Sequence, residues 1–477
     1  MMRSTSARLR AQCAQRCRLA AVAVLSCGSL MASPPETLWT RVFGGEKEEW
    51  GWWVEECYDS GFIMAGRTFS YPNNFERSYV VKTNRDGDLE WSRVLSCWNS
   101  RNNAYCVRQT HDSGFIVAGH TEAFGHTGIL YKLGAAGESL WQHYYAPSQS
   151  TYLFEVAETP DFGFVATGQT YTSPDWNLYV VKTDSYGNIE WEREYGGSNY
   201  DKGEAVICTS DSGYAVLGTT GSSLWLLKLG PSGDSVWARI YGAATGRALM
   251  QTPDCGFVLA GEAYYGPSTN GLVIRTDSSG DTIWKRTPGD YQLAEHFESV
   301  RPTSDGGYVL GGWHYPNEND INVWLAKFDS AGNEVWVGSY GGDSAYDYGY
   351  SAQEVSSGGY VVVGRTDDHG AGNYDLYLVR MGEGTAIDEQ KLPVARQTTI
   401  RGDVRSTLIA GTGLELRESN LQPPAARPKR CDISGRGVYG ARDQGNRYRL
   451  APGVYFLCPA ASLRPGLSGV TKVIVTR

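Results

Sequence analysis

The residues of this chain that could carry out acid–base chemistry are carboxylates spread along 477 residues rather than gathered in one motif. Asp175, Asp320 and Asp375 belong to widely separated stretches. Two carboxylates brought together by a fold can hydrolyse a glycosidic bond, and their separation decides the stereochemistry of the product. Spacing along the chain does not show whether these three meet. A secreted glycan-active enzyme is therefore the alternative hypothesis for this protein.

Residues that could bind a metal show no familiar spacing. Three histidines cluster in the sequence around His120 and His126, but no His-x-x-x-His or Cys-x-x-Cys pairing occurs after residue 33. The segment 367–375 gathers Asp and Asn oxygens without the register of a calcium-binding loop. We expect no metal site, no cofactor and no catalytic residue, and we interpret these side chains as surface or packing residues.

Aromatic residues are the remaining candidates for ligand binding. Trp and Tyr together number 45, and several of them lie outside any repeated pattern, including Trp176 and Trp313. Aromatic rings in loops can stack on sugars or anchor a protein partner. Trp52 and Trp53, however, lie in a strand-like segment, so core packing is an open alternative for such residues.

A repeated unit must position all these residues. The stretch 182–191 combines a strand-like segment, an Asp-x-x-Gly turn and a closing Trp, and the same skeleton recurs along the chain. Gly adopts a positive φ without steric cost and Asp bonds to the turn backbone, so each copy predicts a β-hairpin. The repeat tryptophans are Trp39, Trp91, Trp141, Trp191, Trp237, Trp284 and Trp336.

A second hairpin precedes each of these, with an aromatic residue after its glycine, from Gly61 to Gly359. The period is about 50 residues, which is typical of propeller blades. Two hairpins per unit make a four-stranded blade, and the first is expected at 53–57, 62–68, 79–83 and 89–94. We therefore predict an all-β protein with a seven-bladed β-propeller over residues 34–384.

The two ends of the predicted propeller complement each other. The seventh unit ends near residue 380 without its Trp strand, while residues 39–45 begin the chain's repeat without a partner. Trp39 and the following Phe43-Gly44-Gly45 match Trp191 and Tyr195-Gly196-Gly197 in register. We infer that the N-terminal strand completes the last blade and removes an open sheet edge.

Charge and hydrophobicity divide the chain into regions. Residues 1–33 carry five Arg, no acid and a short apolar run, which predicts an export signal, and no later run is long enough to span a membrane. Residues 34–390 hold 23 Lys or Arg against 47 Asp or Glu, whereas residues 391–477 hold 15 against 5. An acidic propeller disfavours nucleic acid as a partner.

Cysteine use fits an exported protein, in which disulfides are permitted. We expect disulfides between Cys97 and Cys106 and between Cys431 and Cys458. Buried free thiols are an equally good interpretation for Cys57, Cys208 and Cys255, three of the remaining cysteines after residue 33.

After an expected linker at 385–396, residues 397–477 contain an Asp-Ile-Ser-Gly-Arg turn, a Pro-Gly-Val-Tyr-Phe strand and a terminal Lys-Val-Ile-Val strand. This pattern resembles the type A C-terminal sorting domain of type IX secretion system cargo. The resemblance implies a small β-sandwich, the secretion machinery as partner, and a secreted or cell-surface location. The matching residues are Asp432, Ser434, Gly435, Arg436, Pro452, Gly453, Tyr455 and Lys472.

The Asp-x-x-Gly-x-x-x-Trp skeleton is similar to the tryptophan-docking repeat of pyrroloquinoline-quinone dehydrogenases. Those enzymes have eight blades, an adjacent cysteine pair and a calcium-bound quinone, whereas this chain has seven units and no adjacent cysteines. The resemblance therefore covers the hairpin and its packing, not a cofactor site. We predict an exported, non-enzymatic propeller that acts as an extracellular binding or scaffold module for a glycan or protein.

Overall fold

The computed structural model describes residues 32–70, 75–95, 100–123, 125–148, 150–265, 268–288, 294–342 and 345–384, and the backbone of 430–431, 453–457 and 471–475. Contacts divide the chain into two compact units, Met1–Gln390 and Lys391–Arg477. The described residues form β-strands and connecting turns without a helix. Among them there is accordingly no helix with the length and hydropathy needed to cross a membrane.

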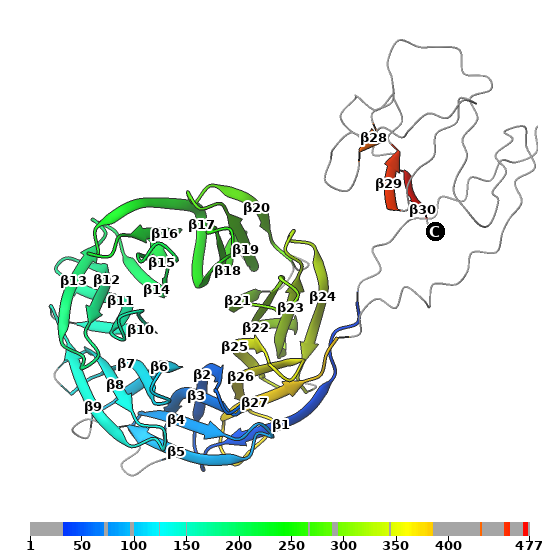
Figure 1. Cartoon of the computed structure of the whole chain (residues 1–477). Coiled ribbons are helices and arrows are strands. Elements are labelled where there is room, and N and C mark those ends of the chain that lie inside the picture. Colours follow the sequence, from blue (N-terminus) through cyan, green and yellow to red (C-terminus); the bar gives the residue numbers. More distant parts are fainter. Residues whose placement is uncertain are drawn as a thin grey trace, which may run out of the picture. The chain divides into compact units, whose positions relative to one another are not determined.

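The first unit is a ring of antiparallel sheets in which consecutive strands are neighbours (Figure 1). Three four-stranded sheets come first. They are β2 (Glu49–Glu56), β3 (Phe62–Thr68), β4 (Arg77–Thr83) and β5 (Leu89–Leu95); β6 (Asn102–Gln109), β7 (Phe115–Thr121), β8 (Thr127–Leu133) and β9 (Ser139–Tyr145); and β10 (Thr151–Glu158), β11 (Phe164–Thr172), β12 (Asp175–Thr183) and β13 (Ile189–Tyr195).

A seven-stranded sheet follows, and then another four-stranded sheet. The long strand β17 belongs to two groups, because its residues up to Ala243 pair with β16 and those from Ala244 pair with β18. The strands are β14 (Asp201–Cys208), β15 (Tyr214–Thr220), β16 (Ser223–Leu229), β17 (Ser235–Gln251), β18 (Phe257–Tyr265), β19 (Ser268–Thr276) and β20 (Thr282–Arg286), then β21 (Glu295–Pro302), β22 (Tyr308–Asn317), β23 (Asp320–Phe328) and β24 (Glu334–Tyr340).

The closing sheet combines the two ends of the first unit. Its order is β1 (Thr37–Phe43), β27 (Asp375–Met381), β26 (Tyr360–Thr366) and β25 (Tyr348–Glu354). Strand β1 is antiparallel to β27, with Trp39 opposite Arg380 and Phe43 opposite Leu376. The prediction that the N-terminal strand completes the last sheet is confirmed.

Two kinds of turn shape the hairpins. In the Asp-x-x-Gly turn, Gly187 has a φ of 84° and Asp184 Oδ1 accepts hydrogen bonds from two backbone N–H groups at 2.9 Å, as expected. In the Asp-Ser-Gly turn the positive φ of 65° lies at Ser60 instead. A Cβ added at the next residue, Gly61, would overlap the carbonyl oxygen of Thr83. Glycine is therefore needed here because the two backbones come close together.

Both faces of the middle strands are buried because each sheet is covered by its neighbours around the ring. In β3, Ile63 and Ala65 pack towards β7 residues such as Phe115, while Phe62 and Met64 pack towards Val361 and Val363 of the closing sheet. Such strands are continuous apolar runs rather than alternating ones. The packing of sheet on sheet therefore builds one core cluster per interface.

The second unit contains the strands β28 (Arg430–Cys431), β29 (Gly453–Leu457) and β30 (Thr471–Val475), which form one antiparallel sheet in that order. Gly453 and Tyr455 of the sorting pattern lie on β29 and Lys472 lies on β30. Asp432, Ser434, Gly435, Arg436 and Pro452, the expected linker and residues 1–31 lie outside the described residues. The predicted sandwich and its sorting role stay predictions.

Candidate functional site

The strand of each sheet nearest the ring centre carries a β-bulge at an equivalent place (Figure 1). A bulge leaves one residue outside the ladder and redirects its side chain. In β2, for example, Gly51 and Trp53 have partners on β3 and Trp52 lies between them. The residues so displaced are Trp52, Tyr105, Phe154, Glu204, Arg247, Glu298 and Tyr350.

A glycine on the neighbouring strand makes room for each bulge. A Cβ added at Gly66 would overlap the carbonyl oxygen of Trp50, two residues before the bulge residue Trp52. No side chain can be tolerated there without moving the backbone. The same overlap occurs at the equivalent glycines, Gly119, Gly168, Gly218, Gly261, Gly312 and Gly364.

All the bulge residues line one cavity of about 510 Å³ at the inner strands. This volume is within the range of about 300–1,000 Å³ that is typical of small-molecule sites. The lining has two chemically different sides. Trp52, Tyr105, Phe154 and Tyr350 provide aromatic rings, while Glu204, Arg247 and Glu298 provide charges.

The aromatic side is a continuous wall. The ring centroid of Trp52 is 4.7 Å from that of Tyr350 and 6.3 Å from that of Tyr105, and Tyr105 meets Phe154 edge-on at 5.2 Å. Lys202 Nζ lies 4.3 Å from the centroid of Phe154. Contiguous rings of this kind can stack on a flat apolar face of a ligand.

The charged side is organised by Arg247. Its guanidinium nitrogens lie 3.3 Å from Glu204, 3.1 Å from Glu262 and 3.6 Å from Glu298. The negative charge of Glu298 is the largest influence on Arg247 and raises its pKa further. Glu204 also pairs with Lys202 at 2.7 Å, so both carboxylates at the bulge positions, Glu204 and Glu298, are held in ion pairs.

Two further arginines lie on the inner strands, Arg108 on β6 and Arg301 on β21, and Arg301 lines the cavity. The guanidinium carbons of Arg108 and Arg301 each lie 4.5 Å from the ring of Trp53. Arg108 pairs with Glu55 and Glu155, but Arg301 has no carboxylate within 4.0 Å among the described residues. Burial and the nearby charge of Arg108 lower the pKa of Arg301 to about 10, so it stays cationic at neutral pH. Arg301 can therefore receive an anionic or hydrogen-bond-accepting group.

The carboxylates proposed from the sequence for glycan hydrolysis lie elsewhere. Asp175, Asp320 and Asp375 begin β12, β23 and β27, which belong to three different sheets, and none of them lines the cavity. Asp375 is almost fully buried, burial raises its pKa, and it accepts a hydrogen bond from the backbone of Gly372 at 3.0 Å. The hypothesis that these three aspartates meet around the channel is wrong.

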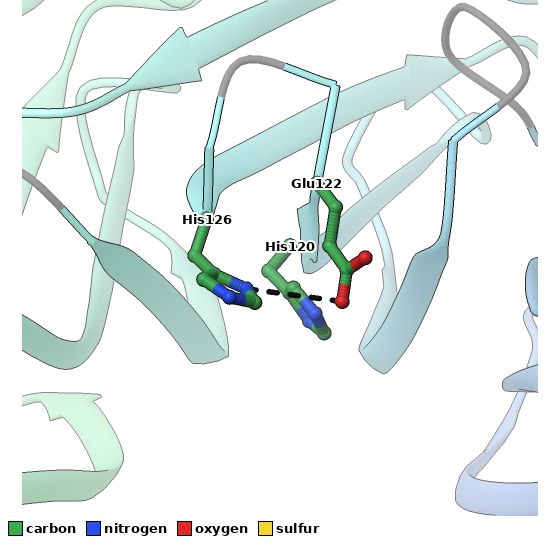
Figure 2. Close-up of side chains that lie close together, drawn as sticks. All are labelled: His120, Glu122 and His126. Carbon is green, nitrogen blue, oxygen red and sulfur yellow. Dashed lines mark ion pairs between the residues drawn. The ribbon is translucent and has the colours of Figure 1, made fainter.

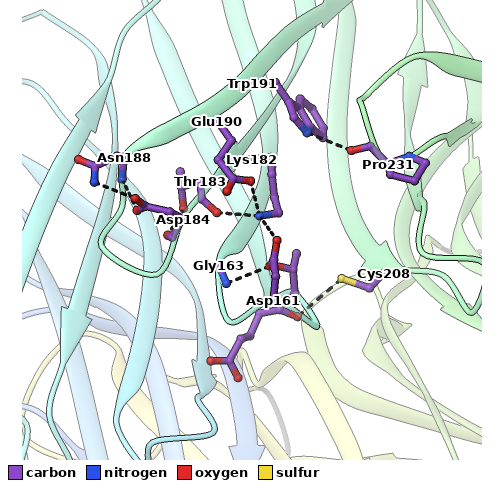
Figure 3. A network of polar contacts seen from close by, with 12 residues as sticks. Asp161, Gly163, Lys182, Thr183, Asp184, Asn188, Glu190, Trp191, Cys208 and Pro231 are labelled. Carbon is purple, nitrogen blue, oxygen red and sulfur yellow. Dashed lines mark hydrogen bonds and ion pairs between the residues drawn. The ribbon is translucent and has the colours of Figure 1, made fainter.

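The repeat tryptophans lie at the outer strands, and six of them cover a turn that lies further along the ring. A Cβ added at Gly233 would be 2.8 Å from the Trp191 ring, whose Nε1 donates a hydrogen bond to the carbonyl of Pro231 at 3.1 Å (Figure 3). The tryptophans Trp39, Trp91, Trp141, Trp191, Trp237 and Trp284 cover Gly87, Gly137, Gly187, Gly233, Gly280 and Gly332 in this way. Trp336, which is 3% exposed, packs edge-on against Tyr360.

A repeated ion pair that the sequence interpretation missed joins the two hairpins of a sheet. Lys182 Nζ lies 2.9 Å from Asp161 and 2.8 Å from Glu190 and donates to the Thr183 carbonyl at 2.9 Å (Figure 3). The sequence does contain a signal for this ion pair. A Lys or Arg lies near the end of the third strand of each unit, about 20 residues after the Asp of the Asp-Ser-Gly turn. The other Lys–Asp pairs are Lys82–Asp59, Lys132–Asp112, Lys228–Asp211 and Lys327–Asp305.

His120, Glu122 and His126 lie together beside the cavity residue Tyr105 (Figure 2). One possible ligand atom from each lies within 4.8 Å of the others. The expectation of no metal site considered spacing along the chain, whereas the hairpin between β7 and β8 brings these three side chains together.

Two further observations concern residues outside the cavity. A larger hollow of about 1050 Å³ is lined by framework residues, including Lys327, Asp305 and Trp336, so we assign it to the scaffold. Cys106 is a buried free thiol whose Sγ lies 3.8 Å from the Val156 carbonyl, and the expected disulfide with Cys97 is therefore wrong. Cys458 lies outside the described residues.

Comparisons with known proteins support the fold alone. No protein-family model and no curated protein sequence matches the chain. Among solved structures, Raptor from Chaetomium thermophilum is similar with a TM-score of 0.50 and 7% identity, over 74% of this chain and 30% of that one. A protein of unknown function from Dyadobacter fermentans matches with a TM-score of 0.44 and 11% identity, over 73% and 99%. The ring of antiparallel sheets and the Raptor match together show a propeller-like repeat fold.

Proposed function

We propose that the first unit is a seven-bladed, non-enzymatic binding propeller that holds an extracellular glycan in its central cavity. The blade count follows if the seven-stranded sheet is divided within β17, where the pairing passes from β16 to β18. Export by residues 1–33 and delivery by residues 397–477 through the type IX machinery are part of the proposal and rest on the sequence patterns.

The observation that carries the proposal is the set of bulge residues. Seven equivalent backbone positions project into one cavity, yet their side chains differ in size and charge. A purely structural position would be filled alike in each unit, as the Trp position is and as the cation of the third strand is, which is Lys in five units and Arg275 or Arg380 in the others. Aromatic rings on one side and hydrogen-bonding charges on the other match the two faces of a sugar ring.

The ion pairs favour binding over hydrolysis. A retaining or inverting glycosidase needs one carboxylic acid that is protonated and able to donate. Glu204 and Glu298, the acids at the bulge positions, both lie within 4.0 Å of the guanidinium of Arg247 and are engaged in ion pairs with it. They are suited to accept hydrogen bonds from sugar hydroxyls.

The test is a panel of polysaccharides and oligosaccharides measured for both binding and release of products. We expect retention without turnover, with affinity at least tenfold weaker for Phe154→Ala. Tyr186→Ala is the matched control, because this tyrosine is 71% exposed on a turn and should leave affinity unchanged. Turnover that disappears in Glu204→Gln or Glu298→Gln would establish the glycan-active enzyme instead, and a panel without any bound glycan would contradict the ligand class.

A further inference from the structure

The cluster of His120, Glu122 and His126 is the strongest unassigned chemistry in the described residues. His120 is the penultimate residue of β7, and the other two lie in the connection from β7 to β8 (Figure 2). Two imidazoles and one carboxylate are the ligand types that zinc selects, whereas calcium and magnesium prefer oxygen ligands alone.

The spacing between Glu122 and His126 suits a shared ion rather than a direct bond. His126 Nδ1 lies 4.0 Å from Glu122 Oε1, which is too far for a hydrogen bond. Two ligands that each lie about 2.1 Å from one tetrahedral zinc ion are about 3.4 Å apart, so the two side chains need to approach by only about 0.6 Å to share an ion. His126 Nδ1 is also buried and has no hydrogen-bond partner, although a third or more of its side chain is exposed. A nitrogen in this state has an unused lone pair or proton that packing alone does not explain.

His120 is held in an orientation that leaves one nitrogen available. Its Nδ1 lies 3.1 Å from the Tyr105 hydroxyl, and its ring stacks on Tyr105 at 5.7 Å between centroids. When Nδ1–H donates to Tyr105, Nε2 keeps its lone pair for a metal, which is the usual arrangement of a ligating histidine. Tyr152 supports both imidazoles, at 4.6 Å from His120 and 5.4 Å from His126.

We propose that His120, Glu122 and His126 bind one Zn²⁺ ion at the edge of the central cavity. Three protein ligands leave the fourth position of a tetrahedral ion open to water or to an oxygen of a bound molecule. The hydrogen bond between His120 and Tyr105 connects this site to the wall of the cavity. The proposal does not depend on glycan binding, because the ligands are all protein side chains.

The experiment titrates the chelator-treated full-length protein with Zn²⁺ by calorimetry. Every protein carries Cys255→Ser, because Cys255 is an exposed thiol that could bind zinc by itself and Ser occupies the same turn position at 60, 113 and 212. We expect one equivalent to bind, with affinity at least tenfold weaker in Glu122→Gln and in His126→Gln. Co²⁺ should give the visible absorption of a four-coordinate ion in the parent and not in these variants.

The matched control is His111→Gln. His111 and Glu158 form a His–carboxylate pair at 2.6 Å outside this three-ligand cluster, so its loss should leave zinc affinity unchanged. Circular dichroism and the melting temperature without zinc check that each variant folds, and both cluster variants lie in the partly exposed hairpin connection. The proposal is overturned if the parent binds no Zn²⁺ in the micromolar range, or if both cluster variants bind it as the parent does.

Discussion

The outer and inner strands of the ring obey different rules. On the outer strands, the same pairings of Trp with Gly recur from sheet to sheet, and the Lys–Asp pair joins the hairpins in the same way. On the inner strands, the backbone repeats its bulge but the displaced residue changes from Trp52 to Glu204 to Arg247.

This difference distinguishes the residues that hold the sheets together from the residues that line the site, and no homologous sequence is needed to see it. A residue that packs two sheets together faces the same demand at every interface, so one side-chain type suffices. A residue that meets a ligand faces a demand that depends on its place around the cavity. Variation among the repeats at one backbone position is thus a marker for the site.

The largest expected effect comes from breaking the framework at its closure. Deleting residues 34–46 removes β1, exposes the edge of β27 and should abolish a cooperative thermal transition of the first unit, a loss of at least about 5 kcal/mol. Deleting residues 391–477, which form a separate unit, should leave the melting temperature of the first unit unchanged. Equal effects of the two deletions would contradict the closing role of β1.

A pair of single substitutions sharpens the comparison. Trp191→Ala should lower the free energy of unfolding by about 3 kcal/mol, because it leaves a cavity beside the Gly233 turn and removes the bond to Pro231. Phe154→Ala, on the cavity wall, should cost about 1 kcal/mol while weakening ligand binding. Urea denaturation measures both, and a larger loss for Phe154→Ala would reverse the assignment of the two regions.

The smallest expected effect is on the stability of the fold at low pH. Burial raises the pKa of Asp211, but hydrogen bonds from Thr209 and Lys228 outweigh this and hold the pKa at about 2. The unfolded value is about 3.9, so this pair stabilises the fold above about pH 4 and loses that contribution as the pH falls towards 2. Asp211→Asn should cost about 1 kcal/mol at neutral pH and flatten the decline between pH 4 and 2.

The control for the acid prediction is Asp234→Asn. Asp234 accepts a hydrogen bond from Ser232 at 2.8 Å and has no ion pair with Lys or Arg among the described contacts. Its substitution should change neither the stability at neutral pH nor the slope of the decline in acid. An equal flattening by both variants would show that the Lys–Asp framework does not set the acid stability.

Local chemistry accounts for what the sequence predicted well. The Gly187 turn is determined within a few residues, because Asp184 bonds to its own turn, and β3 was expected at 62–68 and lies there. The first strand of this sheet was expected to begin at Trp53, but β2 begins at Glu49. The difference arises because the pairing of β2 with β3 continues past the bulge. Bulges depend on strand pairing, which composition does not reveal.

The candidate sites needed distances that cross the chain. Arg247 meets Glu204 from another inner strand, and Tyr105 meets His120 from the paired strand of the same sheet. The sequence does not distinguish Asp175 and Asp375 from Glu204 as candidate acids. Only the ring geometry places the two aspartates at the starts of β12 and β27 and places Glu204 in the cavity wall. Spacing along the chain did not reveal the cluster of His120, Glu122 and His126 for the same reason, since a hairpin brings these residues together.

The pairing of β1 with β27 also has a kinetic consequence. Val42 finds its partner Tyr377 only after nearly the whole unit has been synthesised, so the ring has a very high contact order at its closure. A chain emerging from the ribosome can form its early sheets, but the seam cannot close until the last strand is free. Until then β1 and β27 are both unpaired edges, and the unclosed ring can pair with another chain.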